Sequence, residues 1–315
     1  MPTDAPEADF HPDVELALRL VAEQHPDLLA PLRRVANGWD NVMFRLGDEL
    51  AVRMPRRELA VQLMLHEQRW LPGLAAGLPV PLPAPVRLGR PAPELGYDVP
   101  WSIVPWLPGS AAIGFETADR DAAAVALAEF VVAFGKAAPA DAPVNPFRGV
   151  PLAARDASVR ARLAAGRVAE PEAVARVWER SIAASVRTGP PVWLHGDLHP
   201  ANLLLHADGA LAAVVDFGDL TSGDPATDLA TAWLTFGPDG RAVFRRRVDE
   251  LAAPRDEVEG AAGVGGAAGV DDATWERARG WALVMATAMV DATDAQSPLG
   301  LLGARVLDDV VAEAE

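Results

Sequence analysis

The chain of 315 residues contains no cysteine. It therefore forms no disulfide, has no thiolate zinc site and carries no cysteine nucleophile. It also lacks a long uninterrupted apolar run, because the longest such stretch, residues 122–138, is broken by Glu129 and Lys136. A stretch of that length is too short to span a bilayer. Residues 1–13 have no basic segment followed by an apolar one, so we expect no signal peptide, no membrane partner and a cytoplasmic location.

Basic side chains are scarce as well. Lys and Arg together number 28 against 44 Asp and Glu, which gives a formal net charge of −16. We expect no nucleic acid partner, since phosphate contacts need a basic surface. An acidic protein attracts cationic small molecules, although the same charge can also serve solubility alone. Lys136 is the only lysine, and arginine supplies all the other permanent positive charges of the side chains.

The most informative segment is HGDLHPAN at residues 195–202, followed by DFG at residues 216–218. Asp197, Asn202 and Asp216 form the minimum polar set for moving a γ-phosphoryl group. We predict that Asp197 is the catalytic base, which orients the acceptor hydroxyl, and that Asn202 and Asp216 bind Mg²⁺. Because Asp216 ends an apolar strand, we expect it to be buried and to need a cation. Taken singly, each residue could instead be a cap or turn residue.

Two histidines flank Asp197. His195 and His199 have the spacing of a zinc pair on a helix, but Gly196 and Pro200 argue against a helix here. We therefore predict that the histidines support the shape of the loop, and zinc binding is the alternative.

Two aspartates mark the start of the next helix. Asp224 precedes Pro225 and is expected to cap that helix. Asp228 follows one turn later, and we predict that it faces inward and braces the loop around Asp197. That role is structural rather than catalytic.

Residues 37–41, NGWDN, join two runs with the alternation of β-strands. Asn37, Gly38 and Asn41 could offer backbone N–H groups to phosphates, which would make this segment a phosphate-covering loop. An ordinary hairpin loop is the alternative.

Arg53 occupies the strand position at which protein kinases place a lysine that binds the α- and β-phosphates. Glu67 on the following helix is its expected partner, and Glu58 is the alternative. Arginine keeps the charge and offers a planar fork to phosphate, so the geometry must differ from that of lysine. The competing interpretation is a surface arginine on an edge strand.

The length of the chain predicts two lobes, and the break at residues 105–109 sets their boundary, which gives one lobe at residues 1–105 and one at residues 106–315. Strands are expected at residues 32–36, 42–46, 49–54, 86–88, 99–106, 192–195 and 211–216. Helices are expected at residues 13–24, 56–76, 118–137, 153–165, 171–188, 225–236, 240–251, 272–293 and 300–313. The glycine-rich segment 259–269 follows no strand, so we predict a flexible loop rather than a phosphate cradle.

Together the segments HGDLHPAN, VVDFGD and GDPATDLA resemble the aminoglycoside phosphotransferase family of the protein-kinase-like superfamily. The segments GWDN and AVRMPR are similar to the N-lobe of that family, and Arg53 matches one branch of it. The resemblance implies an α+β, two-lobed protein-kinase-like fold, with a small N-lobe built on an antiparallel sheet and a larger, mostly helical C-lobe. It also implies Mg²⁺, ATP or GTP as co-substrate, and a purine-binding hinge at residues 103–107 that includes Ile103 and Pro105. Gly196 departs from protein kinases, which place arginine there.

Three functions are compatible with these motifs. The first is transfer of the γ-phosphate of ATP or GTP to a hydroxyl of a small cationic molecule, with an aminoglycoside-type antibiotic as the expected acceptor. A metabolic kinase of an amino alcohol, sugar or amino acid is the second, and a non-catalytic nucleotide-binding module is the third. The intact polar set argues against the third. We expect a monomer, with a dimer as the alternative, and acceptor contacts from Asp219, Asp224, Asp291 and Asp294.

Overall fold

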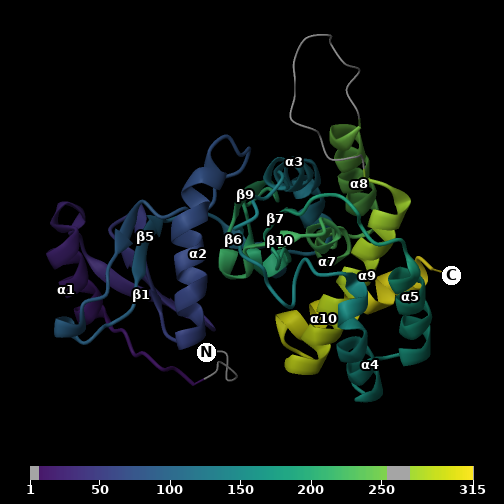
Figure 1. Cartoon of the computed structure of the whole chain (residues 1–315), viewed down its shortest axis with the longest axis horizontal. Helices are drawn as coiled ribbons and strands as arrows, with labels where there is room; N and C mark the ends of the chain where they lie inside the picture. The colour runs from purple at the N-terminus through teal and green to yellow at the C-terminus, as the bar shows by residue number, and fades with distance from the viewer. Residues whose placement is uncertain (1–6, 254–269, 315) are drawn as a thin grey trace, which may run out of the picture. The chain divides into compact units, whose positions relative to one another are not determined.

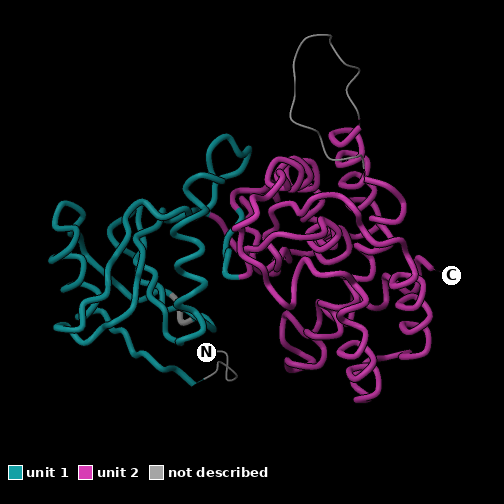
Figure 2. The backbone as a smooth tube through the Cα atoms, viewed as in Figure 1, with its two compact units in different colours: residues 1–108, 214–218 teal, residues 109–213, 219–315 magenta. Residues whose placement is uncertain are grey.

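The computed structural model describes residues 7–253 and 270–314 (Figure 1). The chain divides into two compact units, coloured separately in Figure 2. The first comprises Met1–Pro108 with the short segment Val214–Gly218, and the second comprises Gly109–Ala213 with Asp219–Glu315. Asp216 thus belongs to the first unit. Whether the predicted segments 1–105 and 106–315 act as separate lobes stays a prediction.

The first unit is built on a five-stranded antiparallel sheet. Its strands, in spatial order, are β1 (Leu32–Asn37), β2 (Asn41–Leu46), β3 (Leu50–Pro55), β5 (Trp101–Pro105) and β4 (Arg87–Gly89). Helix α1 (Val14–Gln24) precedes the sheet, and helix α2 (Glu58–Ala75) follows β3 and packs against β3 and β5. β3 is the central strand of the sheet, so its side chains are flanked by neighbours on both sides.

The sequence accounts for these elements locally. Asp13 caps α1, since its carboxylate accepts a hydrogen bond of 2.8 Å from the Leu16 N–H. In β2 half-buried and buried residues alternate, as expected for a strand with one face on a core. That face carries Phe44, which packs in one cluster with Trp101 and with Leu20 of α1.

The second unit is mostly helical, with short strands that carry the functional loops. Its helices are α3 (Ala124–Phe134), α4 (Asp156–Ala164), α5 (Pro171–Ala183), α6 (Ala226–Leu229), α7 (Thr231–Thr235), α8 (Pro238–Ala252), α9 (Asp272–Ala292) and α10 (Pro298–Ala312). Its strands are β6 (Ser110–Ala111), β7 (Val192–Leu194), β8 (Leu203–Leu205), β9 (Leu211–Val214, whose last residue is counted with the first unit) and β10 (Thr221–Gly223). β7 pairs with β10, and β8 lies between β6 and β9. Helix α9 is the central helix of the unit, because α4, α5, α6, α7 and α10 all pack against it.

Several expected elements differ in extent from the structure; the predicted helix 171–188, for example, ends at Ala183. The predicted helix 118–137 begins as a 3₁₀ helix over Ala118–Ala123, and its α-helical part ends at Phe134. The predicted helix 225–236 is divided into α6 and α7 at Ala230. The predicted strand 211–216 ends at Val214, because the backbone turns to a left-handed conformation at Asp216. The glycine-rich segment 259–269 lies outside the described residues.

Membrane insertion has no candidate helix in the described ranges. None of the helices there combines the length and the apolar character that crossing a bilayer requires.

A matched pair of glycines tests the packing of the first unit. A Cβ on Gly89 would lie 2.0 Å from the indole ring of Trp101, which is fully buried and cannot move aside, whereas a Cβ on Gly73 of α2 would meet nothing within 4 Å. We expect Gly89→Ala to lower the free energy of unfolding by about 3 kcal/mol through overpacking. Gly73→Ala should raise it by about 0.5–1 kcal/mol, since alanine favours the helix. Urea unfolding measures both, and equal stability of the two variants would contradict the packing described here.

Candidate functional site

The HGDLHPAN segment forms a tight loop between β7 and β8. It ends in a 3₁₀ turn, Pro200–Asn202. Gly196 has a φ of +86°, and a Cβ at this position would lie 2.4 Å from the carbonyl oxygen of Asp219. Neither the left-handed conformation nor the close contact tolerates a side chain. The backbone therefore explains why glycine stands where protein kinases have arginine.

Asp228 braces this loop from α6. One carboxylate oxygen accepts a hydrogen bond of 2.7 Å from the His195 N–H, and the other accepts one of 2.9 Å from the Gly196 N–H. Asp228 is buried, and this burial raises the pKa of its carboxyl, while His195 and the two N–H donors oppose the rise. Asp228 therefore faces inward and contacts the loop, as expected.

Asp197 is held by three side chains. Asn202 Nδ2 donates to the Asp197 carbonyl oxygen at 2.8 Å and to Oδ2 at 3.3 Å, and His199 Nε2 lies 3.2 Å from the same Oδ2. Arg148 Nη2 donates to Oδ1 at 3.1 Å. Burial acts to raise the pKa of Asp197, but His199 and Arg148 hold it well below its usual range. The side chain keeps an exposed fraction of 27%, so one edge of this carboxylate stays open.

The two histidines support the loop rather than forming a metal pair. His199 Nδ1 accepts a hydrogen bond of 3.2 Å from the Ala201 N–H, so a neutral His199 carries its proton on Nε2, toward Asp197. His195 is fully buried, and its Nδ1 accepts from the Asp197 N–H at 3.2 Å. Among the described residues, no group of three or more His, Asp or Glu could hold a metal ion.

Arg53 is a buried residue of the central strand β3, so the alternative of a surface arginine on an edge strand is wrong. Its Nη1 pairs with Glu67 of α2, and its Nη2 lies 3.3 Å from Asp216 Oδ1. Glu58 is exposed at the start of α2, so Glu67 is the partner. Burial acts to lower the pKa of Arg53, but Glu67 and Asp216 outweigh it, and the arginine stays charged. Burial raises the pKa of Glu67 to about 7, although Arg53 opposes this rise.

The structure corrects the expected burial of Asp216. Its side chain has an exposed fraction of 60%, because β9 ends two residues earlier and the backbone at Asp216 has a φ of +63°. The carboxylate therefore combines one buried arginine partner with an accessible face. A hard oxygen donor in that setting fits Mg²⁺, which keeps several waters and takes few protein ligands.

Asn202 also fits a role beside Mg²⁺. Both of its hydrogen bonds to Asp197 are donated by the amide nitrogen. Its amide oxygen consequently faces away from that contact and is available to a cation. Oxygen donors of this kind suit Mg²⁺ bound to nucleotide phosphates.

The NGWDN loop between β1 and β2 is tied to the start of α2. The Gly38 carbonyl oxygen accepts a hydrogen bond of 3.1 Å from Arg56, and Asp40 pairs with Arg57 at 2.9 Å. Asn41 Oδ1 is buried and has no hydrogen-bond partner. The side chain of Asn37 lies outside what the structure describes. Phosphate binding by this loop stays a prediction.

The predicted purine-binding hinge, residues 103–107, contains residues that differ in burial. Ile103 is fully enclosed in the core, and its carbonyl oxygen accepts a hydrogen bond of 2.8 Å from the Val86 N–H. Ile103 lies in β5, between β3 and β4, and purine binding by this residue stays a prediction. Pro105 is half-buried at the end of β5 and stays a candidate.

Of the four aspartates expected at the acceptor, one lies beside Asp197. Asp219 is half-buried, and its Oδ2 lies 3.7 Å from Arg148, which also contacts Asp197. Asp224 is buried and pairs with Arg277 at 2.6 Å, so it is structural and was wrongly assigned to the acceptor. Its carboxylate also accepts a hydrogen bond of 3.1 Å from the Ala226 N–H, but the N-cap of α6 is Pro225 rather than the expected Asp224.

The remaining two acceptor candidates are exposed at the end of α9. Asp291 lies in the last turn of this helix. Asp294 lies beyond the helix, where its carboxylate accepts a hydrogen bond of 2.7 Å from the Gln296 N–H. Nothing brings either residue to Asp197.

Arg148 is a member of this cluster that the sequence did not indicate. It belongs to the segment NPFRG at residues 145–149, which lies between α3 and α4 and matches no motif. The Asn-Pro pair at its start predicts a turn and nothing about chemistry. Only the fold brings this arginine to Asp197.

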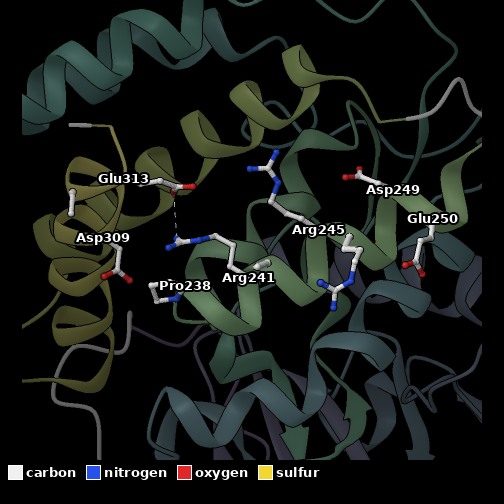
Figure 3. A pocket seen from close by; sticks show the side chains of 10 residues that line it. Pro238, Arg241, Arg245, Asp249, Glu250, Asp309 and Glu313 are labelled. Atoms are coloured by element: carbon white, nitrogen blue, oxygen red, sulfur yellow. Dashed lines mark ion pairs between the residues drawn. The ribbon is translucent and has the colours of Figure 1, made fainter.

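A separate hollow of about 760 Å³ opens in the second unit, between α8 and α10 (Figure 3). Arg241, which is buried, lies 3.8 Å from Glu313 across it. The lining residues are Pro238, Arg241, Ala242, Arg245, Arg246, Asp249, Glu250, Asp309, Ala312 and Glu313. None of them is a predicted site residue, and the lining holds three arginines and four carboxylates, so the hollow favours no ligand charge.

The brace from Asp228 can be tested by substitution. Asp228→Asn keeps one acceptor for the two loop N–H groups but replaces the second acceptor with a donor. We expect the free energy of unfolding to fall by about 2 kcal/mol, because a buried N–H loses its partner. Urea unfolding measures the change, and Asp308→Asn, at an exposed position of α10, is the control that should stay within about 0.5 kcal/mol of wild type. Equal stability of the two variants would rule out the brace.

Comparison with known proteins identifies the family. The model of the phosphotransferase enzyme family matches residues 31–281. None of the curated proteins matches the sequence.

Several solved structures share the fold. Wild-type aminoglycoside 2'-phosphotransferase-IIIa in its GDP complex has a TM-score of 0.65 and 16% identity, over 96% of this chain and 100% of that chain. Macrolide 2'-phosphotransferase MphH from Brachybacterium faecium has a TM-score of 0.56 and 21% identity, over 92% and 97% of the two chains. APH(3'')-Id from Streptomyces rimosus has a TM-score of 0.52 and 19% identity, over 87% and 98%.

At these identities the structures speak for the fold alone, and they confirm the predicted kinase-like α+β architecture. The family model covers most of the sequence and includes every residue of the HGDLHPAN and DFG segments. This chain therefore belongs to the phosphotransferase enzyme family.

Proposed function

We propose that this phosphotransferase moves the γ-phosphate of ATP or GTP to a hydroxyl of a small molecule, with Asp197 as its catalytic residue. The observation that carries the proposal is the state of Asp197. Its carboxylate is fixed by Asn202 and His199, is ionised because its pKa is low, and keeps an open edge. An oriented carboxylate of this kind is what in-line transfer to a hydroxyl requires.

The low pKa defines what Asp197 does. A weakly basic carboxylate does not remove a hydroxyl proton before the reaction, but it accepts the hydrogen bond and directs an oxygen lone pair at the phosphorus. The proton then passes to Asp197 as the new bond forms, once the hydroxyl oxygen has become acidic. Catalysis in this scheme comes from positioning rather than from a covalent intermediate.

Asn202 and Asp216 are the proposed ligands of Mg²⁺, through the amide oxygen and the exposed carboxylate described above. When bound, Mg²⁺ would neutralise charge on the nucleotide phosphates. Arg53 is the proposed phosphate-binding cation, and its pairing with Glu67 fixes the guanidinium before nucleotide arrives. His195, His199 and Asp228 support the loop.

For the acceptor, we propose an aminoglycoside-type antibiotic. Two features support this class: the net charge of −16, which favours cationic small molecules, and the fold shared with aminoglycoside phosphotransferases. A macrolide phosphotransferase has the same fold, so macrolides are the second class to test. A metabolic hydroxyl compound is the remaining alternative.

Release of nucleoside diphosphate tests this function. Wild type should release it in the presence of ATP or GTP, Mg²⁺ and one member of a panel of aminoglycosides, macrolides, sugars and amino alcohols. We expect Asp197→Ala to lower kcat by about 10²- to 10⁴-fold. Asp208→Ala, in an exposed turn after β8, is the matched control and should leave kcat unchanged. Activity that survives in Asp197→Ala would overturn the proposed mechanism.

Nucleotide binding by Arg53 has its own test. We expect Arg53→Ala to raise the KM for nucleotide by about 10- to 100-fold, because a charged hydrogen bond to phosphate is lost. Arg33→Ala, on the exposed face of β1, removes the same charge from the same sheet and should change KM little. Steady-state kinetics at saturating acceptor measure both, and an unchanged KM in Arg53→Ala would refute the assignment.

A further inference from the structure

Arg148 lies between two carboxylates of the second unit. Its Nη2 donates to Asp197 Oδ1 at 3.1 Å and lies 3.7 Å from Asp219 Oδ2. Two carboxylates that converge on one point repel each other unless a cation separates them. Arg148 supplies that cation. It is also the residue that contacts Oδ1, whereas His199 and Asn202 contact Oδ2.

The segment that carries Arg148 is fixed on both sides of it. Before Arg148, the Asn145 N–H donates to Thr221 Oγ1 at 2.9 Å. After it, the Gly149 N–H donates to Thr227 Oγ1 at 3.2 Å, and the Gly149 carbonyl oxygen accepts from the Asp224 N–H at 3.0 Å. These contacts anchor the segment to the chain between β10 and α6.

Gly149 makes this anchoring possible. Its φ of +68° is left-handed, and a Cβ there would lie 2.9 Å from Leu194 and 3.1 Å from the Ser222 carbonyl oxygen. Leu194 is the last residue of β7, directly before the loop of Asp197. The backbone next to Arg148 is thus pressed against the strand that delivers the catalytic loop.

Asn145 orients the second carboxylate. Its Nδ2 donates to Asp219 Oδ1 at 2.6 Å, and its Oδ1 accepts from the Phe147 N–H at 2.8 Å. Asp219 is therefore held with one oxygen on Asn145 and the other toward Arg148. The amide, the two carboxylates and the guanidinium thus form a chain of contacts in the order Asn145, Asp219, Arg148, Asp197.

The position of Arg148 carries an energetic cost. Its Nε is buried and has no hydrogen-bond partner, as is also true of the Nε of Arg155, and a buried donor without an acceptor destabilises the fold. Arg155 lies close enough to feel the charge of Arg148, and burial together with Arg148 lowers the pKa of Arg155. Both features oppose the position of Arg148, and the contact with Asp197 is what offsets them.

We propose that Arg148 is a positioning residue of the phosphotransfer reaction: it holds Oδ1 of Asp197 in the orientation that the acceptor hydroxyl meets. The proposal rests on the proposed function, in which Asp197 receives that hydroxyl. A carboxylate oxygen has two lone pairs, so Oδ1 can accept from Arg148 and from the hydroxyl together. Without Arg148, repulsion from Asp219 would turn the Asp197 carboxylate away.

Steady-state kinetics of three variants test the proposal. Arg148→Gln should lower kcat by about 10- to 100-fold, as expected when a catalytic group is misplaced, with the KM for nucleotide changed by less than about threefold. Arg148→Lys should recover part of kcat, because it restores the charge but not the fork. Arg155→Gln removes the same charge nearby without touching Asp197, and it should leave kcat unchanged. Thermal unfolding of each variant verifies folding.

A crystal structure of Arg148→Gln gives a second measurement that does not depend on turnover. A rotated Asp197 carboxylate, parted from His199 or Asn202, supports the proposal. An unchanged Asp197 conformation overturns it, as do an unchanged kcat or a loss of kcat matched by Arg155→Gln. If wild type transfers phosphate to no acceptor in the panel, the proposed function fails, and the Asp197 conformation in the variant decides the positioning role alone.

Discussion

The loop that carries Asp197 depends on one carboxylate, that of Asp228. Both of its oxygens are used by consecutive backbone N–H groups, those of His195 and Gly196. The loop could not otherwise leave β7 so sharply, because the left-handed turn at Gly196 leaves those donors without partners inside the loop. Every other contact of Asp197, from His199, Asn202 and Arg148, presupposes that turn. A single buried acceptor therefore fixes the geometry of several polar groups.

The two units use buried charge in the same way. In the first, Arg53 joins Glu67 to the exposed Asp216, and in the second, Arg148 joins Asp197 to Asp219. In both triplets an arginine lies between two carboxylates, one more exposed than the other. Arginine suits this position because its planar fork addresses two oxygens at once and keeps its charge when buried. Each unit thus contains an oriented carboxylate, Asp216 or Asp197, whose negative charge is partly neutralised by the neighbouring arginine.

The sequence predicted contacts correctly where residues close together in the chain determine them. The bracing by Asp228 and the pairing of Arg53 with Glu67 both follow from local patterns and one strand-to-helix relation, and the structure shows both contacts. The catalytic and magnesium roles of Asp197, Asn202 and Asp216 stay proposals. Prediction from the sequence failed where tertiary contacts decide. The residues next to Arg148 and Asp224 in the sequence do not predict their ion-pair partners. Hydropathy placed Asp216 in a strand, but β9 ends two residues before it, at Val214. Periodicity reports which face is apolar, but not where the chain turns or which distant charge it meets.

The guanidinium at position 53 also bears on regulation. A kinase that binds phosphate through a lysine amine can be inactivated when that amine is acylated, because acylation removes the charge. Arg53 offers no such amine, and the only lysine of the chain, Lys136, is an exposed residue beyond the end of α3. Lysine acylation therefore has no route to Arg53, the proposed nucleotide-binding charge of this chain.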